Sequence, residues 1–550
     1  MSVKFANNAF GTLSAGISAS GTSITLASGQ GARFPTLSSG EYFYATLIDT
    51  SNNLEVVKCT ARSTDVLTVT RAQESTTAQA FVIGDRVELR VTAQGLDDAA
   101  NPYDKDTSST GSLALPVGTT AQQPTAADTE GHIRYDSDDN VVYFSNGTDW
   151  LKVSSVIATL SGVTGNIFAG FTSTLTLTGK GFQSANLVVS FTQSSDSIDE
   201  DVTVTPASDT SATVTVPAAV YSSVTAGNVV TITVTNSDGV ESAGQTTTAL
   251  ALPSGGTVTT SGSTRTHKFT SSGSFINTVN SLSLDVLIVG GGGGGGASLS
   301  GGGGGGGVAY ATGLSKNAAT YSLTVGSGGA GPANTATAGG NGGSSSAFGQ
   351  TVTGGCGAAS RYSSTRGNSL ANGAGGSNGN ITTGTNGTKP TAISGFTTYG
   401  GFNGGNSTSS GNNYPGGGGA GAGANGQSPS NNNSAGGNGG NGVQNSILGT
   451  NYYWAGGGGG ASYIGGNGAG NGGLGGGGGG SANTGSAGTG GGSALNAGGN
   501  GTSGGGDSSA NDDGGAGGAN TGGGGGAASH EGDNLDGDGG SGIVVIKYTL

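Results

Sequence analysis

Residues 284–296 read LDVLIVGGGGGGG, and residues 541–548, close to the C-terminus, read SGIVVIKY. Each stretch holds a run of aliphatic and β-branched residues, which suits a strand in the middle of a sheet. Between them glycine is exceptionally dense, since 21 of the 119 glycines lie in residues 1–255 and the other 98 follow. We expect the apolar runs 284–289 and 543–548 to pair and to close the glycine-rich region at its base.

The glycine-rich region cannot build an ordinary hydrophobic core, and ordering each glycine costs roughly 0.5–1 kcal/mol relative to alanine. Low-complexity disorder is therefore one interpretation, whereas collagen is excluded by the missing Gly-X-Y period. The glycine runs alternate with segments rich in Tyr, Phe, Trp and Asn, which a flexible linker does not need. We predict a stack of left-handed, polyproline II-like glycine segments whose backbones hydrogen-bond to one another. The main runs span residues 290–296, 301–307, 416–419, 456–460, 475–480 and 522–526.

Composition excludes several classes of protein. Only 9% of the residues are charged and the formal net charge is −14, which argues against a nucleic-acid partner because phosphate binding needs clustered Lys and Arg. The N-terminus lacks the apolar segment of a secretory signal, and no apolar run is long enough for a membrane span. Cys59 and Cys356 fall in different predicted domains, so we expect two packed thiols and no disulfide.

The chain divides into four predicted domains, and the predicted fold is an all-β, multidomain fibrous protein. Residues 1–98 alternate short β-rich runs with turns, which indicates a small N-terminal β domain. Residues 155–252 hold about seven alternating runs, as expected of an immunoglobulin-like β sandwich. Residues 253–550 form the glycine-rich domain, a polyglycine II-like sandwich closed by flanking β strands.

Residues 99–154 are predicted to be a linker that carries a small β-hairpin module. The runs 132–135 and 141–144 flank an acidic turn, which is typical of a hairpin. A unit of this size buries too little apolar surface to be stable alone. Its aromatic residues are expected to pack either against copies from neighbouring chains or against an adjacent domain of the same chain: Tyr135, Tyr143, Phe144 and Trp150.

The sequence offers no convincing catalytic constellation, so we expect no enzyme and no cofactor. The three histidines, His132, His267 and His530, lie in different modules. Two Gly-x-Ser-x-Gly matches, at 375–379 and 501–505, do not stand between a strand and a helix as a nucleophile elbow requires. A polysaccharide-cleaving enzyme would need paired carboxylates in a cleft.

Residues 531–538 are acidic and imitate the first half of a calcium-binding loop. Val545 stands where that loop would need Glu, so no metal site is predicted. A solvated acidic loop is favoured over weak cation binding by Glu531, Asp533, Asp536 and Asp538.

Aromatic residues between the glycine runs are the candidate binding residues. Rigid aromatic anchors among Asn, Ser and Thr are typical of recognition loops. An alternative holds for residues 452–454, which could instead cover the glycine core as part of the fold. The candidates are Tyr399, Phe402, Tyr414, Tyr452, Tyr453, Trp454 and Tyr463, with Tyr362 as a further aromatic of the same region.

Resemblances to known families cover nearly the whole chain. Residues 27–49 (ASGQGARFPTLSSGEYFYATLID) resemble a β domain that begins many tail-fibre and other virion proteins of tailed bacteriophages. Residues 115–124 (LPVGTTAQQP) are similar to a short tail-fibre module that commonly occurs as trimers, and residues 175–182 (LTLTGKGF) resemble the IPT/TIG domain. Residues 284–296 and 451–462 (NYYWAGGGGGAS) look like the glycine-rich domain at the distal end of tail fibres and adhesins.

These resemblances imply a phage tail fibre protein that mediates host-cell recognition and adsorption through its C-terminal tip. The implied partners are a virion tail or baseplate protein at the N-terminus and a bacterial polysaccharide or outer-membrane protein at the tip. The implied assembly is a homotrimer in the virion tail fibre, made in the host cytoplasm without a signal peptide. Alternatives are a passive structural fibre or decoration protein, then a secreted bacterial adhesin or a depolymerase.

Overall fold

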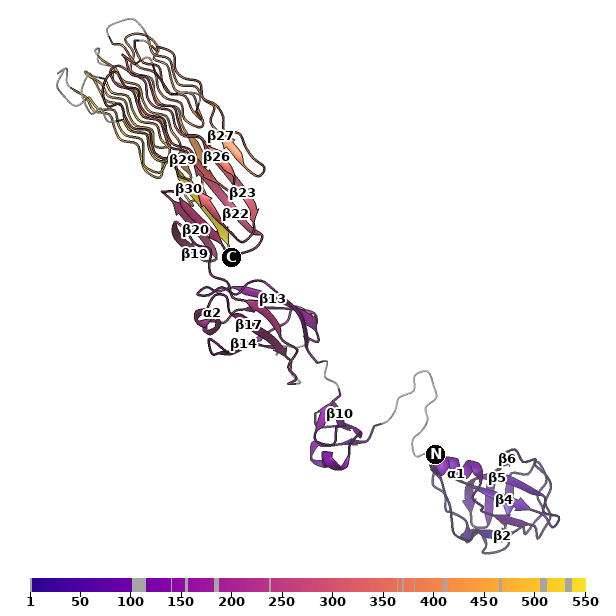
Figure 1. The fold of residues 1–550 in the computed structure, drawn as a ribbon. Coiled ribbons are helices and arrows are strands. Elements are labelled where there is room, and N and C mark those ends of the chain that lie inside the picture. Colours follow the sequence, from indigo (N-terminus) through magenta and orange to yellow (C-terminus); the bar gives the residue numbers. More distant parts are fainter. Residues whose placement is uncertain are drawn as a thin grey trace. The chain divides into compact units, whose positions relative to one another are not determined.

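The computed structural model confirms a chain made mainly of strands, arranged in several separate sheets (Figure 1). It describes residues 2–100, 115–139, 141–153, 157–182, 187–236, 239–363, 365–367, 370–379, 381–408, 413–463, 467–504, 512–529 and 537–550. The chain forms two compact units, Met1–Ser155 and Val156–Leu550. Within the described ranges, no helix is both long and apolar enough to cross a membrane.

The N-terminal domain is one sheet with the strand order β2-β7-β4-β5-β6-β3, and β1 adds to β4 in parallel. Its centre is the hairpin of β4 and β5. Asp49 fixes the turn between them, because its carboxylate accepts the N–H groups of Ser51 and Asn53. The strands are β1 (Ser2–Val3), β2 (Phe10–Thr12), β3 (Ser23–Thr25), β4 (Glu41–Ile48), β5 (Leu54–Ser63), β6 (Val66–Gln73) and β7 (Arg86–Glu88), with η1 (Gly31–Arg33) and α1 (Ala93–Ala100).

An ion pair lies inside this domain. Arg71 and Glu55 are 2.6 Å apart, and both side chains are almost completely buried. The Glu55 carboxylate also accepts the backbone N–H of Ala72, and the guanidinium of Arg71 donates to the carbonyl of Ser18. Each buried charge therefore has several partners, as a stable buried pair requires.

The small module has the predicted hairpin and two further strands, in the order β11-β10-β9-β8. Cross-strand pairs such as Val142 and Tyr135 join β9 to β10. Two short 3-10 turns cover one face of this sheet. The elements are β8 (Val117–Gly118), η2 (Thr120–Gln122), η3 (Ala126–Asp128), β9 (Ile133–Asp136), β10 (Val141–Ser145) and β11 (Trp150–Lys152).

Residues 159–248 form the predicted sandwich, in which a three-stranded and a four-stranded antiparallel sheet share one core. Alternate residues point inward, so Leu175 and Leu177 from one sheet meet Phe191 and Ile232 from the other. The sheets are β12 (Thr159–Thr164), β13 (Thr174–Lys180) and β16 (Ser211–Thr215), and β15 (Ile198–Val204), β14 (Leu187–Gln193), β17 (Val229–Thr235) and β18 (Gln245–Thr248), with α2 (Ala218–Ser223) at one edge.

A six-stranded sheet, named here the base sheet, closes the glycine-rich region as predicted. Its order is β19-β20-β30-β22-β23-β27, and β22 pairs antiparallel with β30 through Leu287 and Val545. The strands are β19 (Thr257–Ser261), β20 (Thr264–Phe269), β22 (Leu282–Val289), β23 (Val308–Lys316), β27 (Thr397–Tyr399) and β30 (Ile543–Thr549). The same region holds three two-stranded antiparallel sheets: β21 (Gly273–Asn277) with β24 (Ala319–Leu323), β25 (Ser345–Ala347) with β26 (Gln350–Val352), and β28 (Val443–Asn445) with β29 (Tyr452–Trp454).

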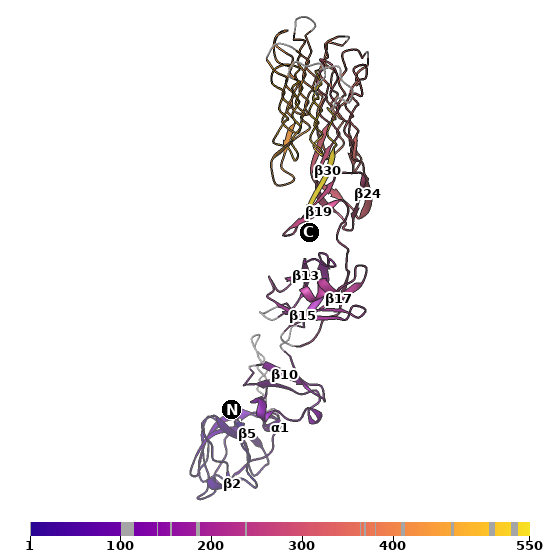
Figure 2. The same ribbon diagram turned by 90° about the vertical axis from the view of Figure 1, so that its left-hand side faces the viewer.

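Beyond the base sheet the glycine segments run side by side in both views (Figures 1 and 2). Each segment bonds to several others, and along one segment the partner repeats every third residue, which is the period of the polyproline II helix. The N···O distances for residues 290–296 lie between 2.8 and 3.1 Å. Gly290, Gly293 and Gly296 donate to 301–307, Gly291 and Gly294 donate to 340–343, and Gly292 and Gly295 donate to 537–540.

The close approach of these backbones explains why the segments are glycine. A Cβ placed on Gly303 would lie 2.1 Å from the carbonyl oxygen of Gly293, and one on Gly458 would lie 2.0 Å from that of Gly525. The region is thus ordered by hydrogen bonds between backbones, and the disordered alternative does not apply to the segments described.

Candidate functional site

The stack has two ends with different properties. Residues 290, 307 and 542 adjoin the base sheet, whereas the segments reverse at turns such as 297–300 at the opposite end. A glycine segment of seven residues rising about 3.1 Å per residue separates the ends by roughly 20 Å. The candidate aromatic residues divide between these two ends, so they do not form one site.

Five of the candidates lie at the base end. Tyr399 ends β27 and pairs with Val308, and its side chain is 38% exposed. Phe402 follows it and is half-buried, as are Tyr452 and Tyr453 in β29.

Trp454 belongs to the fold. Its side chain is completely buried in a cluster with Leu287, Val289 and Val545 on one face of the base sheet. The indole N–H points to the carbonyl of Asn445, 3.4 Å away. In this conformation Trp454 has no surface to offer a partner, which agrees with the alternative given for residues 452–454.

Tyr414 and Tyr463 lie at the turn end, together with Tyr362. The backbone N–H of Tyr463 donates to the carbonyl of Asn413 at 3.0 Å, which ties two neighbouring turns together. The Asn413 side chain donates to the carbonyl of Ser434 in a third turn, also at 3.0 Å. The turns therefore support one another through one backbone hydrogen bond and one amide side chain.

An arginine organises the aromatic residues at this end. The guanidinium carbon of Arg361 lies 5.3 Å from the ring centre of Tyr362 and 5.7 Å from that of Tyr414. Tyr362 is 52% exposed, whereas Arg361 and Tyr414 are half-buried. We call these three residues the Arg361 cluster.

Arg361 was missed from the sequence, although a signal was present. Residues 253–550 contain only seven Lys and Arg residues, so a cation beside a tyrosine at a segment end is unusual here. A guanidinium presents a planar fork of donors to carboxylates or phosphates, and tyrosine supplies a flat contact surface with a polar tip. The cluster can therefore bind a ligand that combines apolar faces with anionic or hydroxyl groups.

Residues 269–505 match the family model of the glycine-rich domain. The match spans β22, β23 and most of the glycine segments, and it includes the Arg361 cluster. No curated protein matches the chain. The C-terminal half of the protein thus contains a glycine-rich domain.

Other candidate sites in and near the glycine-rich domain offer less chemistry. The described residues contain no group of three or more His, Cys, Asp and Glu side chains that could hold a metal ion. His530, Glu531, Asp533 and Asp536 lie outside the described residues. Asp538 is described, and its carboxylate accepts the backbone N–H of Gly331.

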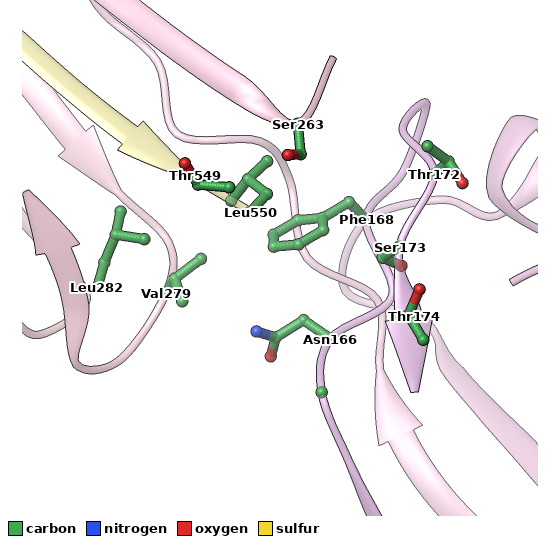
Figure 3. A pocket seen from close by; sticks show the side chains of 11 residues that line it. Asn166, Phe168, Thr172, Ser173, Thr174, Ser263, Val279, Leu282, Thr549 and Leu550 are labelled. Atoms are coloured by element: carbon green, nitrogen blue, oxygen red, sulfur yellow. The ribbon is translucent and has the colours of Figure 1, made fainter. Parts of the chain in front are cut away.

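Figure 3 shows a hollow of about 370 Å³ between loops of the sandwich and the base sheet. Phe168 of the sandwich enters the apolar cluster of the glycine-rich domain, where it lies with Phe269 and Val279. The residues that line the hollow carry no titratable side chain. It is a gap in an apolar joint, and it shares no lining residue with the Arg361 cluster.

Proposed function

We propose that this protein is a tail fibre protein of a tailed bacteriophage, and that its glycine-rich domain recognises the bacterial surface. The observation that carries the proposal is the turn end of the stack, where a rigid backbone scaffold holds an arginine between two tyrosines. Adsorption of this kind breaks no bond. It requires only a surface held in a fixed geometry, which lowers the entropy lost on binding.

The Arg361 cluster is the proposed centre of the contact surface. Tyr362 is exposed and Tyr414 is held close by, so a sugar ring or a protein loop can lie against the rings while Arg361 donates to an acidic or hydroxyl group. The receptor would be a surface polysaccharide or an outer-membrane protein. Tyr463 lies at the same end and extends this surface.

The proposed assembly places several copies of the tip on one virion. The N-terminal domain would attach to a tail or baseplate protein, and the chains would form a homotrimeric fibre. Linked copies raise a weak single-site affinity by about 10²–10⁴-fold. The protein would be made in the host cytoplasm and function in the virion.

Binding of the full-length protein to a panel of intact bacterial strains tests the proposal. We expect saturable binding to susceptible strains, and we expect the protein to block phage adsorption to them. Arg361→Ala and Tyr414→Ala should each weaken binding at least tenfold, because a central aromatic or arginine contact contributes about 2 kcal/mol. Each variant should keep the circular dichroism spectrum of the wild-type protein.

Tyr399→Ala is the matched control, since it removes a partly exposed tyrosine from the base end. Binding that falls with Tyr399→Ala but not with Tyr414→Ala would move the contact surface to the base sheet. A folded protein that neither binds nor competes on a susceptible strain would indicate a passive structural fibre. Release of reducing sugars from host polysaccharide would indicate a depolymerase.

A further inference from the structure

One side of the glycine stack is an outer layer of segments that lie side by side. Each segment is joined to the next by backbone hydrogen bonds with N···O distances of 2.8–3.0 Å, such as those from Gly426 to Asn403 and from Gly439 to Asn471. Because a polyproline II segment has three residues per turn, every third residue points out of the stack. In order across the layer the segments are 382–388, 401–407, 424–428, 436–442, 468–474 and 485–492.

Asparagine occupies most of the outward positions in the middle of this layer. Two residues that are three apart on one segment, such as Asn438 and Asn441, are separated by about 9 Å. Asn438 is half-buried, and the other asparagines of the layer are exposed. We define the asparagine face as Asn403, Asn406, Asn425, Asn438, Asn441 and Asn471.

The side-chain oxygens of this face complete the scaffold. An outer segment has no neighbouring segment on one side, so some of its N–H groups find no backbone carbonyl. The N–H of Asn403 donates to Oδ1 of Asn425 at 2.8 Å, and the N–H of Asn471 donates to Oδ1 of Asn438 at 2.7 Å. Oδ1 of the remaining members accepts in the same way, from Gly387 to Asn403, from Gly384 to Asn406, from Leu474 to Asn441 and from Thr489 to Asn471.

The side-chain nitrogens of the face point the other way. Because each backbone N–H needs an acceptor, Oδ1 must face the neighbouring segment, and Nδ2 with its two N–H donors must face away from it. Asn438 donates from Nδ2 to Oε1 of Gln427 at 3.1 Å. For the other members of the face, no hydrogen bond from Nδ2 to any described residue is formed. The scaffold therefore holds a fixed pattern of amide donors at the surface.

This pattern restricts the chemistry of a ligand. Outward N–H donors need acceptors, and an amide carbonyl is an acceptor that cannot itself donate. A phosphate-rich ligand needs clustered Lys and Arg, whereas the face and its outward neighbours Ser428, Leu474 and Thr489 carry no charge. An extended peptide repeats about every 7 Å along one side, which does not match the spacing of about 9 Å along a segment. A polymer of N-acetylated sugars carries amide carbonyls on an extended chain, and its disaccharide unit has a length comparable to that spacing.

We propose that the asparagine face binds a neutral polysaccharide of N-acetylated sugars. The chain would lie flat along the side of the stack, and the Nδ2 groups would donate to its acetamido carbonyls. The donors are already held in place by the scaffold, so little entropy is lost when they bind. The net charge of −14 disfavours an acidic polymer. The asparagine face shares no residue with the Arg361 cluster, so this inference and the proposed adsorption can succeed or fail separately.

Cosedimentation of the full-length protein with insoluble chitin tests the inference. We expect saturable binding to chitin. Binding to cellulose should be weaker by about tenfold or more, because cellulose has the same extended backbone without the acetamido carbonyls that would accept the hydrogen bonds. A protein that does not sediment with chitin, or that binds cellulose equally well, would overturn the inference.

Replacing asparagine by aspartate separates binding from folding. Aspartate keeps an oxygen that accepts the neighbouring N–H, but it replaces the outward donors by a second oxygen. The triple variant Asn403→Asp, Asn425→Asp, Asn471→Asp should weaken chitin binding about 100-fold, since each lost hydrogen bond accounts for a factor of about five. The calorimetric transition of the glycine-rich domain should be retained. If the triple variant lost that transition, Asn425→Asp alone should still weaken binding about fivefold.

Asn341→Asp is the matched control. Asn341 is exposed, and its Oδ1 accepts the N–H of Gly357 at 2.9 Å, but its segment is not part of the outer layer defined above. This variant introduces the same chemical change at another place on the stack, and it should bind chitin as the wild-type protein does. Folded aspartate variants of the asparagine face that bind chitin as well as Asn341→Asp does would overturn the inference.

Discussion

Gly303 lies in the middle of the stack, and we predict that Gly303→Ala disrupts it. The new Cβ would lie 2.1 Å from the carbonyl oxygen of Gly293 and 2.7 Å from its carbonyl carbon. Neither backbone can move freely. The N–H of Gly303 donates to the carbonyl of Gly525, the carbonyl of Gly303 accepts the N–H of Gly458, and the carbonyl of Gly293 accepts the N–H of Gly525, all at 2.8–2.9 Å.

The expected cost follows from these contacts. Restoring an ordinary van der Waals distance requires a shift of roughly 1 Å, which breaks about two buried backbone hydrogen bonds at ~1 kcal/mol or more each. Overpacking adds about 1–3 kcal/mol. We therefore expect Gly303→Ala to lower the free energy of unfolding of the glycine-rich domain by about 4 kcal/mol.

Guanidinium unfolding followed by tryptophan fluorescence measures this cost. The chain has two tryptophans, so a Trp150→Phe background leaves Trp454 as the only one, and it is completely buried beside the base sheet. Its signal reports the glycine-rich domain alone, which matters because a chain of several units does not unfold in one step.

Gly492→Ala is the matched control. A Cβ at Gly492 would meet no atom within 4 Å. This variant therefore reduces the conformational freedom of the unfolded chain as much as Gly303→Ala does, but it introduces no clash in the folded chain. Its effect should be neutral or a stabilisation of about 0.4–1 kcal/mol. If the two variants differed by less than about 0.5 kcal/mol, which is the usual size of a surface substitution, the steric explanation of the stack would be wrong.

Three further predictions concern buried groups. Trp454→Ala should destabilise the glycine-rich domain by about 3–5 kcal/mol, seen as a lower temperature of its calorimetric transition; an unchanged transition would mean that the indole is not part of the core. Burial lowers the pKa of His267, whose Nε2 lies 2.9 Å from the Tyr548 hydroxyl. The unfolded chain therefore binds a proton at His267 more readily than the folded chain does, so the free energy of unfolding should fall as the pH drops below about 6.5. In unfolding measured from pH 8 to 5, His267→Gln should reduce this dependence on pH. Arg71→Leu leaves the carboxylate of Glu55 buried without its partner, so it should lower the free energy of unfolding of the N-terminal domain by about 3–5 kcal/mol. A loss below about 1 kcal/mol in that domain's unfolding transition, which is typical of exposed ion pairs, would contradict the burial of the pair.

Much of the fold could be predicted because its signals are local. Alternating or β-branched runs indicated β22, β30 and the strands of the N-terminal domain and the sandwich. The acidic turn between residues 132–135 and 141–144 indicated the hairpin of β9 and β10. The pairing of β22 with β30 followed from two apolar runs that bracket a region without a core of its own. These patterns are carried by side chains, which is why they can be read from the sequence.

The arrangement of the candidate site could not be predicted in the same way. Whether an aromatic residue lies at the base end or the turn end depends on how many segments precede it and on which way each one runs. Those directions are fixed by bonds between backbones, which leave no side-chain pattern. For this reason Tyr399 and Tyr414 lie at opposite ends of the stack although they are close in sequence. Arg361 could not be predicted because the pattern typical of recognition loops is carried by aromatic and small polar residues.

The small module is an exception to the usual rule that apolar residues lie inside. Arg134 and Asp136 alternate with Ile133 and Tyr135, so the register could have buried either set. The turns supply backbone N–H and carbonyl groups to the charged pair, and the two remaining polar atoms, Nη1 of Arg134 and Oδ2 of Asp136, face each other at 3.7 Å without a hydrogen bond. Burial acts to raise the pKa of Asp136, but these donors outweigh it and hold the pKa below its usual value.

The threefold repeat of the glycine segments also limits how the gene can change in length. Inserting or deleting one residue within a segment such as 290–296 would turn every following N–H by a third of a revolution, away from its acceptor. A change of three residues would restore the phase, and a change within a turn would not disturb it at all. Length variation among related glycine-rich domains should therefore gather in the turns, where the exposed surface can diversify while the scaffold beneath stays the same.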